Sequence, residues 1–267
     1  MPPFWHLAIE CSANGGSVAL LKNSRPEVAP VVRGQIILPT DRGSVQTLAP
    51  AIHALLRPAQ LRVGDLKFIS VTVGPGSFTG LRVGLATVKM LAMAGQIPIA
   101  PVDTLAAIAR RFAVERGSKL NEPVRLVTAI NAFRKQLFTA SWYVNGSCVS
   151  KMRSSSVVDL SAWREDPWGV DIPNSPHTSD SDENRSTDSS AIWLSGSALE
   201  LTPVLAGPAP TNVPALVRIA DANLWQPLAE QVGVLGWEIY LQGGAVSAGE
   251  LAPNYIRASA AEEKLRS

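Results

Sequence analysis

A glycine-rich motif that follows an apolar run holds the side chains most suggestive of catalysis or ligand binding. A serine hydrolase would need the arrangement G-x-S-x-G, with the serine in the middle. Here Phe78 is the middle residue, Ser77 directly follows a glycine, and no base for Ser77 is indicated. Serine at such a place is typical of a helix cap, so the sequence favours that role for Ser77. The motif consists of Gly74, Pro75, Gly76, Ser77, Phe78, Thr79 and Gly80.

Phosphate binding is the second chemistry that this motif could do. A Gly-Pro-Gly turn between a strand and a helix resembles the places where backbone amides and the helix dipole hold anions. The chain lacks the lysine of G-x-x-x-x-G-K-[ST] and the third glycine of a dinucleotide fingerprint, so a structural turn is favoured. Glu10, at the end of the first predicted strand, could bind a hydrated cation. Glu10 and Ser12 are the candidate nucleotide-binding residues.

Metal chemistry finds little support in the sequence. The histidines His6, His53 and His177 fall in different predicted elements and form no H-x-x-x-H pair. The two cysteines, Cys11 and Cys148, form no C-x-x-C pair and are too few for a disulfide framework. The sequence therefore predicts no metal site and is compatible with a reducing compartment.

Four basic residues could meet RNA phosphates, namely Arg134, Lys135, Lys151 and Arg153. Charges at hairpin tips are usually solvated, and no obvious platform of stacking aromatics is interleaved with them. The formal net charge of +2 gives no strongly basic field. Any RNA role is therefore expected to be shared with another protein.

A strand and a helix must position the glycine-rich motif. Residues 68–73 are apolar and β-branched, which predicts a buried strand that the Gly-Pro-Gly turn ends. The helix predicted over 81–94 carries apolar residues on more than one face. Such a helix must be covered on two sides, either by its own domain or by a partner.

The other predicted elements form two series along the chain. The first series has three strands, a helix over 47–56, the motif strand and helix, and a further strand, which suits a mixed sheet flanked by helices. The second begins with strands over 124–130, 136–144 and 148–152, and helices are expected over 214–222 and 227–241. Segment 171–190 is so poor in apolar residues that we expect it to be disordered. The predicted lobes are 1–105 and 106–267.

Composition bounds the class of protein. A chain of 267 residues with 46% hydrophobic residues is long enough for one large domain or two ordinary lobes. Its apolar runs are interrupted before they reach the length of a membrane-spanning helix, and no signal-type N-terminus is present. We therefore expect a cytoplasmic protein that does not enter a membrane.

Several stretches together resemble one known family. They are Leu7–Ser12 (Leu-Ala-Ile-Glu-Cys-Ser), Ser17–Leu20, Gly74–Gly84 and Pro253–Arg257 (Pro-Asn-Tyr-Ile-Arg). With these residues the chain resembles the TsaB (YeaZ) family, closely over residues 7–111 and loosely in the second lobe. The resemblance implies an α/β fold with two lobes of the actin, sugar-kinase and heat-shock ATPase type.

The resemblance also implies a role in making threonylcarbamoyladenosine in tRNA. In that family TsaB is a noncatalytic scaffold that pairs with the catalytic homologue TsaD, and a small ATPase, TsaE, joins the assembly. Contact with tRNA is then expected only through the complex, as is any ATP or ADP with magnesium, and no intrinsic cofactor is expected. The superfamily's older name, M22 glycoprotease, is not supported by these histidines.

The leading hypothesis is a helical interface with a TsaD-like subunit or with a second copy of this chain. It uses helix 81–94 with helix 47–56 beside it. The alternatives are an independent nucleotide hydrolase or phosphotransferase that uses a cleft between the lobes and, behind it, a peptidase. The predicted interface residues are Leu81, Arg82, Leu85, Val88, Lys89, Ile52 and Leu55.

The chain departs from the family pattern at four places, one of which is Gln136-Leu137-Phe138 where the family usually has an acidic, tyrosine-containing return strand. Glu10 stands where the family usually has Asp, and Ser44 replaces a common histidine. Asn131-Ala132-Phe133 replaces Asp-Ala-Arg after the first strand of the second lobe. These departures affect the second lobe and the cation contact, and they leave the predicted pairing surface unchanged.

Overall fold

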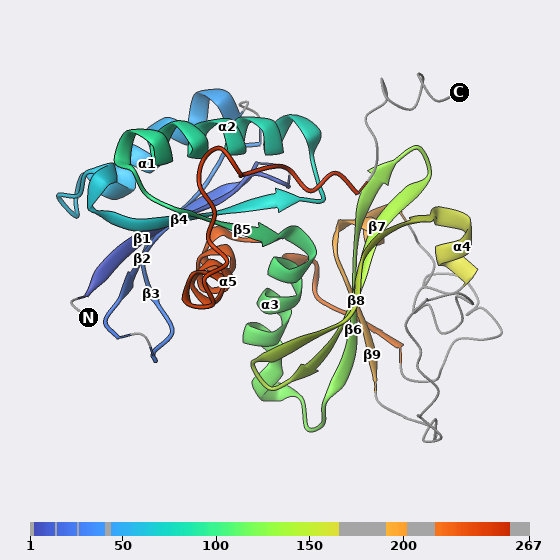
Figure 1. Ribbon diagram of the computed structural model, residues 1–267. Helices are drawn as coiled ribbons and strands as arrows, with labels where there is room; N and C mark the ends of the chain where they lie inside the picture. The colour runs from blue at the N-terminus through green and yellow to red at the C-terminus, as the bar shows by residue number, and fades with distance from the viewer. Residues whose placement is uncertain are drawn as a thin grey trace. The chain divides into compact units, whose positions relative to one another are not determined.

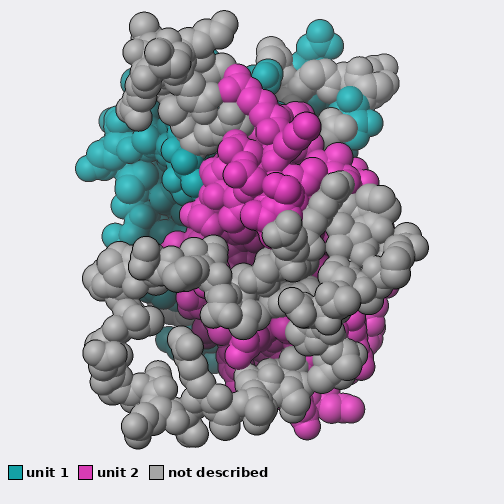
Figure 2. Space-filling view, turned by 90° about the vertical axis from the view of Figure 1, so that its right-hand side faces the viewer, with its two compact units in different colours: residues 1–111, 226–267 teal, residues 112–225 magenta. Residues whose placement is uncertain are grey.

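The computed structural model describes residues 3–13, 15–25, 27–40, 44–165, 191–201 and 217–256. The chain divides into two compact units, coloured teal and magenta in Figure 2. Unit 1 comprises Met1–Arg111 and Gln226–Ser267, and unit 2 comprises Phe112–Trp225. The sequence predicts lobes 1–105 and 106–267, and the structure instead assigns the C-terminal segment to unit 1. The predicted disordered segment 171–190 lies outside the described residues.

Unit 1 is built on a mixed sheet with the strand order β3-β2-β1-β4-β5. Strand β1 pairs antiparallel with β2 and parallel with β4, and β4 is parallel to β5. Side chains of β1 alternate between the two faces, so Leu7 and Ile9 belong to one core cluster and Ala8 to another. The strands are β1 (Phe4–Glu10), β2 (Ser17–Asn23), β3 (Val31–Ile37), β4 (Leu66–Gly74) and β5 (Ile99–Asp103).

Helices cover both faces of this sheet. Figure 1 shows α1 and α2 on one face and α5 on the opposite face. Helix α5 contacts β1, β2, β4 and β5, which is why residues 226–267 belong to unit 1 rather than to the predicted second lobe. Helix α3 continues from unit 1 into unit 2. The helices are α1 (Ser44–Leu56), the 3-10 turn η1 (Val63–Asp65), α2 (Phe78–Gly95), α3 (Thr104–Arg116) and α5 (Ala229–Leu241).

Unit 2 contains a second mixed sheet, with the order β10-β9-β6-β7-β8. Strands β6, β7 and β8 form antiparallel hairpins, and β9 lies parallel to both β6 and β10. The strands are β6 (Val124–Phe133), β7 (Gln136–Asn145), β8 (Cys148–Asp159), β9 (Ile192–Ser195) and β10 (Val217–Ile219). Short helices join them: η2 (Gly117–Lys119), α4 (Leu160–Glu165), η3 (Ser197–Leu201) and η5 (Ala222–Leu224).

The predicted class is confirmed, since two mixed sheets are each flanked by helices. The helix expected over 214–222 is wrong: Val217–Ile219 pairs with β9 as β10, and Ala222–Leu224 is a 3-10 turn. Within the part of the chain that the structure describes, no helix has the length and apolar character to cross a membrane.

Candidate functional site

The glycine-rich motif lies where β1 and β4 end side by side. Because the two strands are parallel, their carboxyl ends meet at one edge of the sheet. The turn after β1 is bonded to β4 and α2: the backbone N–H of Cys11 donates to Thr72 Oγ1 at 3.2 Å. The backbone N–H of Ser77 donates to the carbonyl of Ser12 at 2.7 Å. The start of α2 is thereby held against the turn that follows β1.

This contact is close enough to require glycine. A Cβ at Gly80 would lie 2.1 Å from the carbonyl oxygen of Cys11, and one at Gly76 would lie 2.5 Å from that of Ser12. Ser77 Oγ accepts the N–H of Gly80 at 3.3 Å, which confirms Ser77 as the N-cap of α2. The chain itself therefore occupies the space and one of the N–H groups that a phosphate would use, and this favours the structural interpretation of the motif.

Glu10 is closed inside the same turn. Its carboxyl group is buried, with the residue only 1% exposed. Its Oε1 accepts the N–H and the hydroxyl of Ser12, each at 2.5 Å, and the N–H of Ala13 at 3.2 Å. Among the described residues its Oε2 has no hydrogen-bond partner. Burial raises the pKa of Glu10, and the hydrogen bonds from Ser12 and Ala13 oppose that shift.

The two candidate nucleotide-binding residues are therefore brought together, but toward the interior. Glu10 binds Ser12, and the two residues are 1% and 5% exposed. Their role in this structure is to shape the turn, and contact with a nucleotide stays a prediction. Among the described residues, no three His, Cys, Asp or Glu side chains lie close enough to hold a metal ion.

Most of the predicted interface residues lie on the inner, buried sides of α1 and α2. Leu81, Leu85 and Val88 are buried, and so is Ile52 of α1. Leu55 is half-buried against the same core. These residues hold the helices on the sheet and present little to a partner. Of the predicted set, only Arg82 is exposed, and Lys89 is partly exposed.

A different set of α2 residues faces outward, and we call it the α2 outer face. Met90 and Met93 are each 71% exposed, and Phe78 is 43% exposed. The members of this set recur every three or four residues, as residues on one side of a helix do. The sequence pattern therefore predicts the set once the inner side of the helix is known. The sequence pattern missed the methionines because both faces of the helix are apolar. The α2 outer face consists of Phe78, Arg82, Ala86, Met90 and Met93.

Tyr255, near the C-terminus of the chain, contacts the α2 outer face where helix α2 begins. The Arg82 guanidinium lies over the Phe78 ring, 3.8 Å from its centroid, and Nε–H of Arg82 donates to the Tyr255 hydroxyl at 3.3 Å. The backbone N–H of Asn254 donates to the carbonyl of Val73 at 2.7 Å. Two stretches that resemble the family, around Gly74 and around Tyr255, are thus neighbours in unit 1.

The chain is similar to known proteins. The family model for "TsaD: tRNA N6-adenosine threonylcarbamoyltransferase" matches residues 32–265. A tRNA N6-adenosine threonylcarbamoyltransferase of Streptococcus equi subsp. equi is 34% identical over 110 residues, which are 38% of this chain and 32% of that protein. The tRNA threonylcarbamoyladenosine biosynthesis protein TsaB of Bacillus subtilis is 32% identical over 162 residues, 60% of this chain and 64% of that protein.

The fold is shared with a solved structure over nearly its whole length. YeaZ from Pseudomonas aeruginosa has a TM-score of 0.68, covers 94% of this chain and 99% of its own, and is 24% identical. The chain spans about a third of the length of the transferases that it matches and less than two thirds of TsaB. Because the family model matches residues 32–265, well over half of the chain, the protein belongs to the TsaD family, and within it the chain is similar to TsaB (YeaZ), as its motifs predict.

Proposed function

We propose that this protein is a noncatalytic, TsaB-like scaffold in the synthesis of threonylcarbamoyladenosine in tRNA. It binds a TsaD-like catalytic subunit through the α2 outer face. The observation that carries the proposal is the exposure of Met90 and Met93, each 71%, on a helix whose other side is already packed in the core. Large apolar side chains gathered on one face indicate an interaction site.

The chemistry of that face suits a protein partner. Methionine side chains are flexible and polarizable, so they adapt to a partner's surface. An arginine stacked on an aromatic ring, as Arg82 is on Phe78, joins two residue types that are enriched at interfaces. Arg82 is also held by Tyr255, which lowers the entropy cost of fixing its side chain in a complex.

The noncatalytic role is supported by the state of the motif residues. Ser77 caps a helix, and Glu10 is enclosed by the backbone of its own turn. Neither presents a nucleophile or a base to a substrate. In this proposal the chemistry belongs to the TsaD-like partner, which binds tRNA and any ATP or ADP with magnesium, while a TsaE-like ATPase joins the complex in the cytoplasm.

The test uses the protein with its cognate TsaD-like subunit. We expect a complex at micromolar concentration by light scattering and a loss of affinity of about tenfold or more in Met90→Glu/Met93→Glu, since charge would be buried in an apolar contact. Both side chains are exposed, so the variant should keep its fold. Met152→Glu in β8 is the matched control, because Met152 is 52% exposed in unit 2.

An unchanged affinity in the double variant would contradict the proposed interface. Leu85→Glu is no substitute, because Leu85 is 5% exposed and the variant would lose core packing together with binding. Sedimentation of the protein alone tests the alternative partner, a second copy of the chain. A dimer that Met90→Glu/Met93→Glu dissociates would assign the face to self-association. ATP turnover by the isolated protein would contradict the noncatalytic role.

A further inference from the structure

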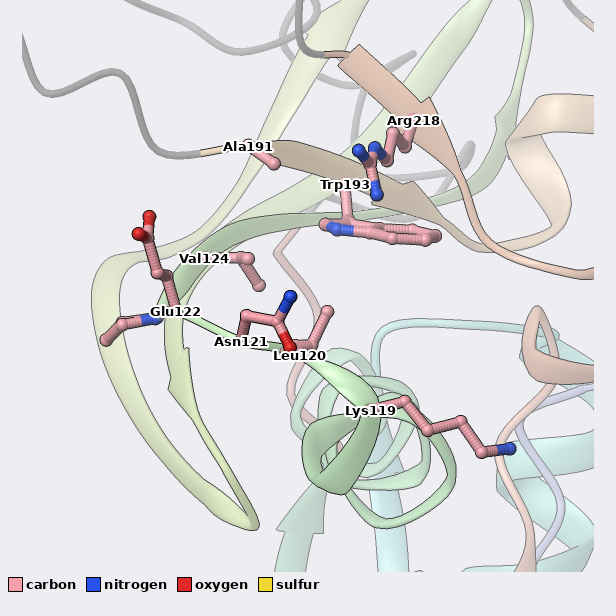
Figure 3. Close-up of a pocket in the computed structure, with 9 residues that line it drawn as sticks. Lys119, Leu120, Asn121, Glu122, Val124, Ala191, Trp193 and Arg218 are labelled. Atoms are coloured by element: carbon pink, nitrogen blue, oxygen red, sulfur yellow. The ribbon is translucent and has the colours of Figure 1, made fainter.

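A cavity in unit 2 lies apart from the α2 outer face. Its volume is about 340 Å³, which lies within the range of small-molecule pockets. Strands β9 and β10 form one side, and the segment that leads from η2 into β6 forms the other (Figure 3). The lining residues are described parts of unit 2: Lys119, Leu120, Asn121, Glu122, Pro123, Val124, Ala191, Trp193 and Arg218.

Trp193 forms part of the wall of this cavity. The residue is 7% exposed, and its Nε1–H has no hydrogen-bond partner among the described residues. A buried N–H without an acceptor is unfavourable, and most such groups in proteins are satisfied. The Nε1 atom itself has no accessible surface, so a ligand in the cavity would contact the ring of Trp193 rather than this N–H.

Arg218 places a positive charge beside the same ring. Arg218 pairs with Trp193 across β9 and β10, so the two side chains share one face of the sheet. The Arg218 guanidinium carbon lies 5.7 Å from the centroid of the Trp193 ring, and Figure 3 shows the guanidinium group directed toward the indole. Among the described residues Arg218 has no carboxylate in ion-pair range.

Of the described cations around the cavity, Arg218 is the one that lies beside the Trp193 ring without an ion pair. Arg116 also lies 5.7 Å from the Trp193 ring centroid, but it forms an ion pair with Asp221. Lys119 and Glu122 carry opposite charges, and the Lys119 side chain extends away from Trp193 in Figure 3. The amide of Asn121 faces Trp193 from the opposite side. The uncharged part of the wall comes from Leu120, Pro123, Val124 and Ala191.

We propose that this cavity binds a small planar ligand that carries an oxyanion. The Arg218 guanidinium binds its oxygen atoms, because the fork of N–H donors on a guanidinium matches a phosphate or a carboxylate. The apolar wall holds the flat body of the ligand. Phosphate and carboxylate share this recognition chemistry, so both kinds of ligand are tested. The proposal is independent of the proposed scaffold function, since all lining residues belong to unit 2.

The test is a calorimetric titration of the whole protein with AMP, benzoate, adenosine and inorganic phosphate, each in a separate experiment. In parallel, the indole ¹⁵N–¹H signals are recorded, and Trp193→Phe identifies the Trp193 signal by its loss. We expect AMP or benzoate to bind and to shift that signal. Adenosine, which lacks the oxyanion, and phosphate, which lacks the ring, should each bind about tenfold more weakly.

Two variants decide whether binding occurs in this cavity. Arg218→Gln should weaken binding about tenfold while the indole signals other than that of Trp193 stay native, since Arg218 is exposed. Arg57→Gln in α1 removes an exposed guanidinium elsewhere and should leave affinity unchanged. AMP binding without benzoate binding assigns the site to phosphates, and the reverse assigns it to carboxylates. Absence of binding by both, or binding that Arg218→Gln leaves intact, overturns the proposal.

Discussion

Glu10 is a buried carboxyl group at a strand end whose hydrogen bonds hold a turn in place. Its Oε1 takes three hydrogen bonds from the residues that follow it, which closes the turn after β1. The same closure removes the group from water and raises its pKa. His6, four residues earlier on β1, is also buried and stacks on Phe68, with ring centroids 4.4 Å apart. Burial lowers the pKa of His6 to about 4. These two groups give unit 1 opposite responses to pH.

Replacing Glu10 with Gln should change the pH dependence of stability. A raised carboxyl pKa means that the folded state holds its proton more tightly, so stability is lost as pH rises above the ordinary value of 4.5. Glu10→Gln keeps an acceptor for Ser12 and Ala13 but carries no charge. We expect the variant to be more stable than the parent at pH 8, and the difference to shrink toward pH 4. Urea unfolding across this range measures it, and a difference that grows on acidification would contradict it.

Replacing His6 with Phe should change the pH dependence of folding stability at acidic pH, whereas replacing Glu10 changes it at higher pH. The pKa of His6 falls from 6.5 to about 4, so the unfolded chain binds a proton that the folded chain excludes between these values. Stability due to His6 is therefore present above pH 6.5 and lost as pH falls. At about 1.36 kcal/mol per pKa unit, the loss approaches about 3 kcal/mol. His6→Phe should flatten the acid limb of the stability curve. An equally steep limb in the variant would exclude His6 as its cause.

Gly80 tests the contact between α2 and the turn after β1. A Cβ there would meet the Cys11 carbonyl oxygen at 2.1 Å, so Gly80→Ala should destabilise the protein by about 2 kcal/mol or more. The clash outweighs the gain of about 1 kcal/mol that alanine brings to a helix interior. Gly64→Ala is the control, because nothing lies within 4 Å of a Cβ at that position. Thermal unfolding compares them, and equal stability of both variants would count against the contact.

Helix α2 has two apolar sides, one buried against the sheet of unit 1 and one exposed. Its inner side carries Leu81, Leu85 and Val88, which pack on the sheet of unit 1. Its outer side carries Met90 and Met93, which no described residue buries. A helix that is apolar on two sides exposes apolar surface to water unless another element or a partner covers its second side. We take the second side as the proposed partner surface.

Alanine substitutions separate the two sides of α2 by stability alone. Leu85→Ala removes buried methyl groups and should cost about 2–5 kcal/mol of unfolding free energy. Met90→Ala changes an exposed side chain and should stay within about 0.5 kcal/mol. Chemical denaturation of the isolated protein measures both. A large effect of Met90→Ala would mean that its side chain is covered in the free protein.

At the scale of the whole molecule, unit 1 is completed by residues far apart in the chain. Helix α5 covers the sheet face that carries Ala8, Leu21 and Val102. The two parts of unit 1 meet closely, since Arg111 Nη1 donates to the carbonyl of Gln226 at 2.7 Å. Unit 2 is therefore inserted between two segments that already lie together.

Unit 1 should fold without the inserted unit. A chain in which a short glycine linker joins Arg111 to Gln226 should unfold cooperatively and show dispersed NMR signals, because its sheet keeps helices on both faces. The fragment 1–111 alone should not, since the face covered by α5 would be exposed to water. Cooperative unfolding of that fragment would show that α5 is dispensable.

The local features of this protein could be predicted from the order of its residues. The apolar run 68–73, the Gly-Pro-Gly turn and Ser77 predict a strand, a turn and a capped helix, and the structure has them as β4 and α2. Such features depend on neighbours within a few residues, so composition and spacing are sufficient to predict them. The same motifs were specific enough to indicate the family.

The tertiary structure decided which faces and which distant segments meet. Periodicity could not choose between the two apolar sides of α2, so the predicted interface fell on the buried Leu81 and Leu85. Residues 217–219 are a strand because β9 offers a parallel partner, and the β-branched Val217 and Ile219 suit that strand. The burial of Glu10 and the cavity beside Trp193 likewise arise only when segments remote in sequence pack together. Contacts between remote residues depend on chain closure and packing, which local pattern does not encode.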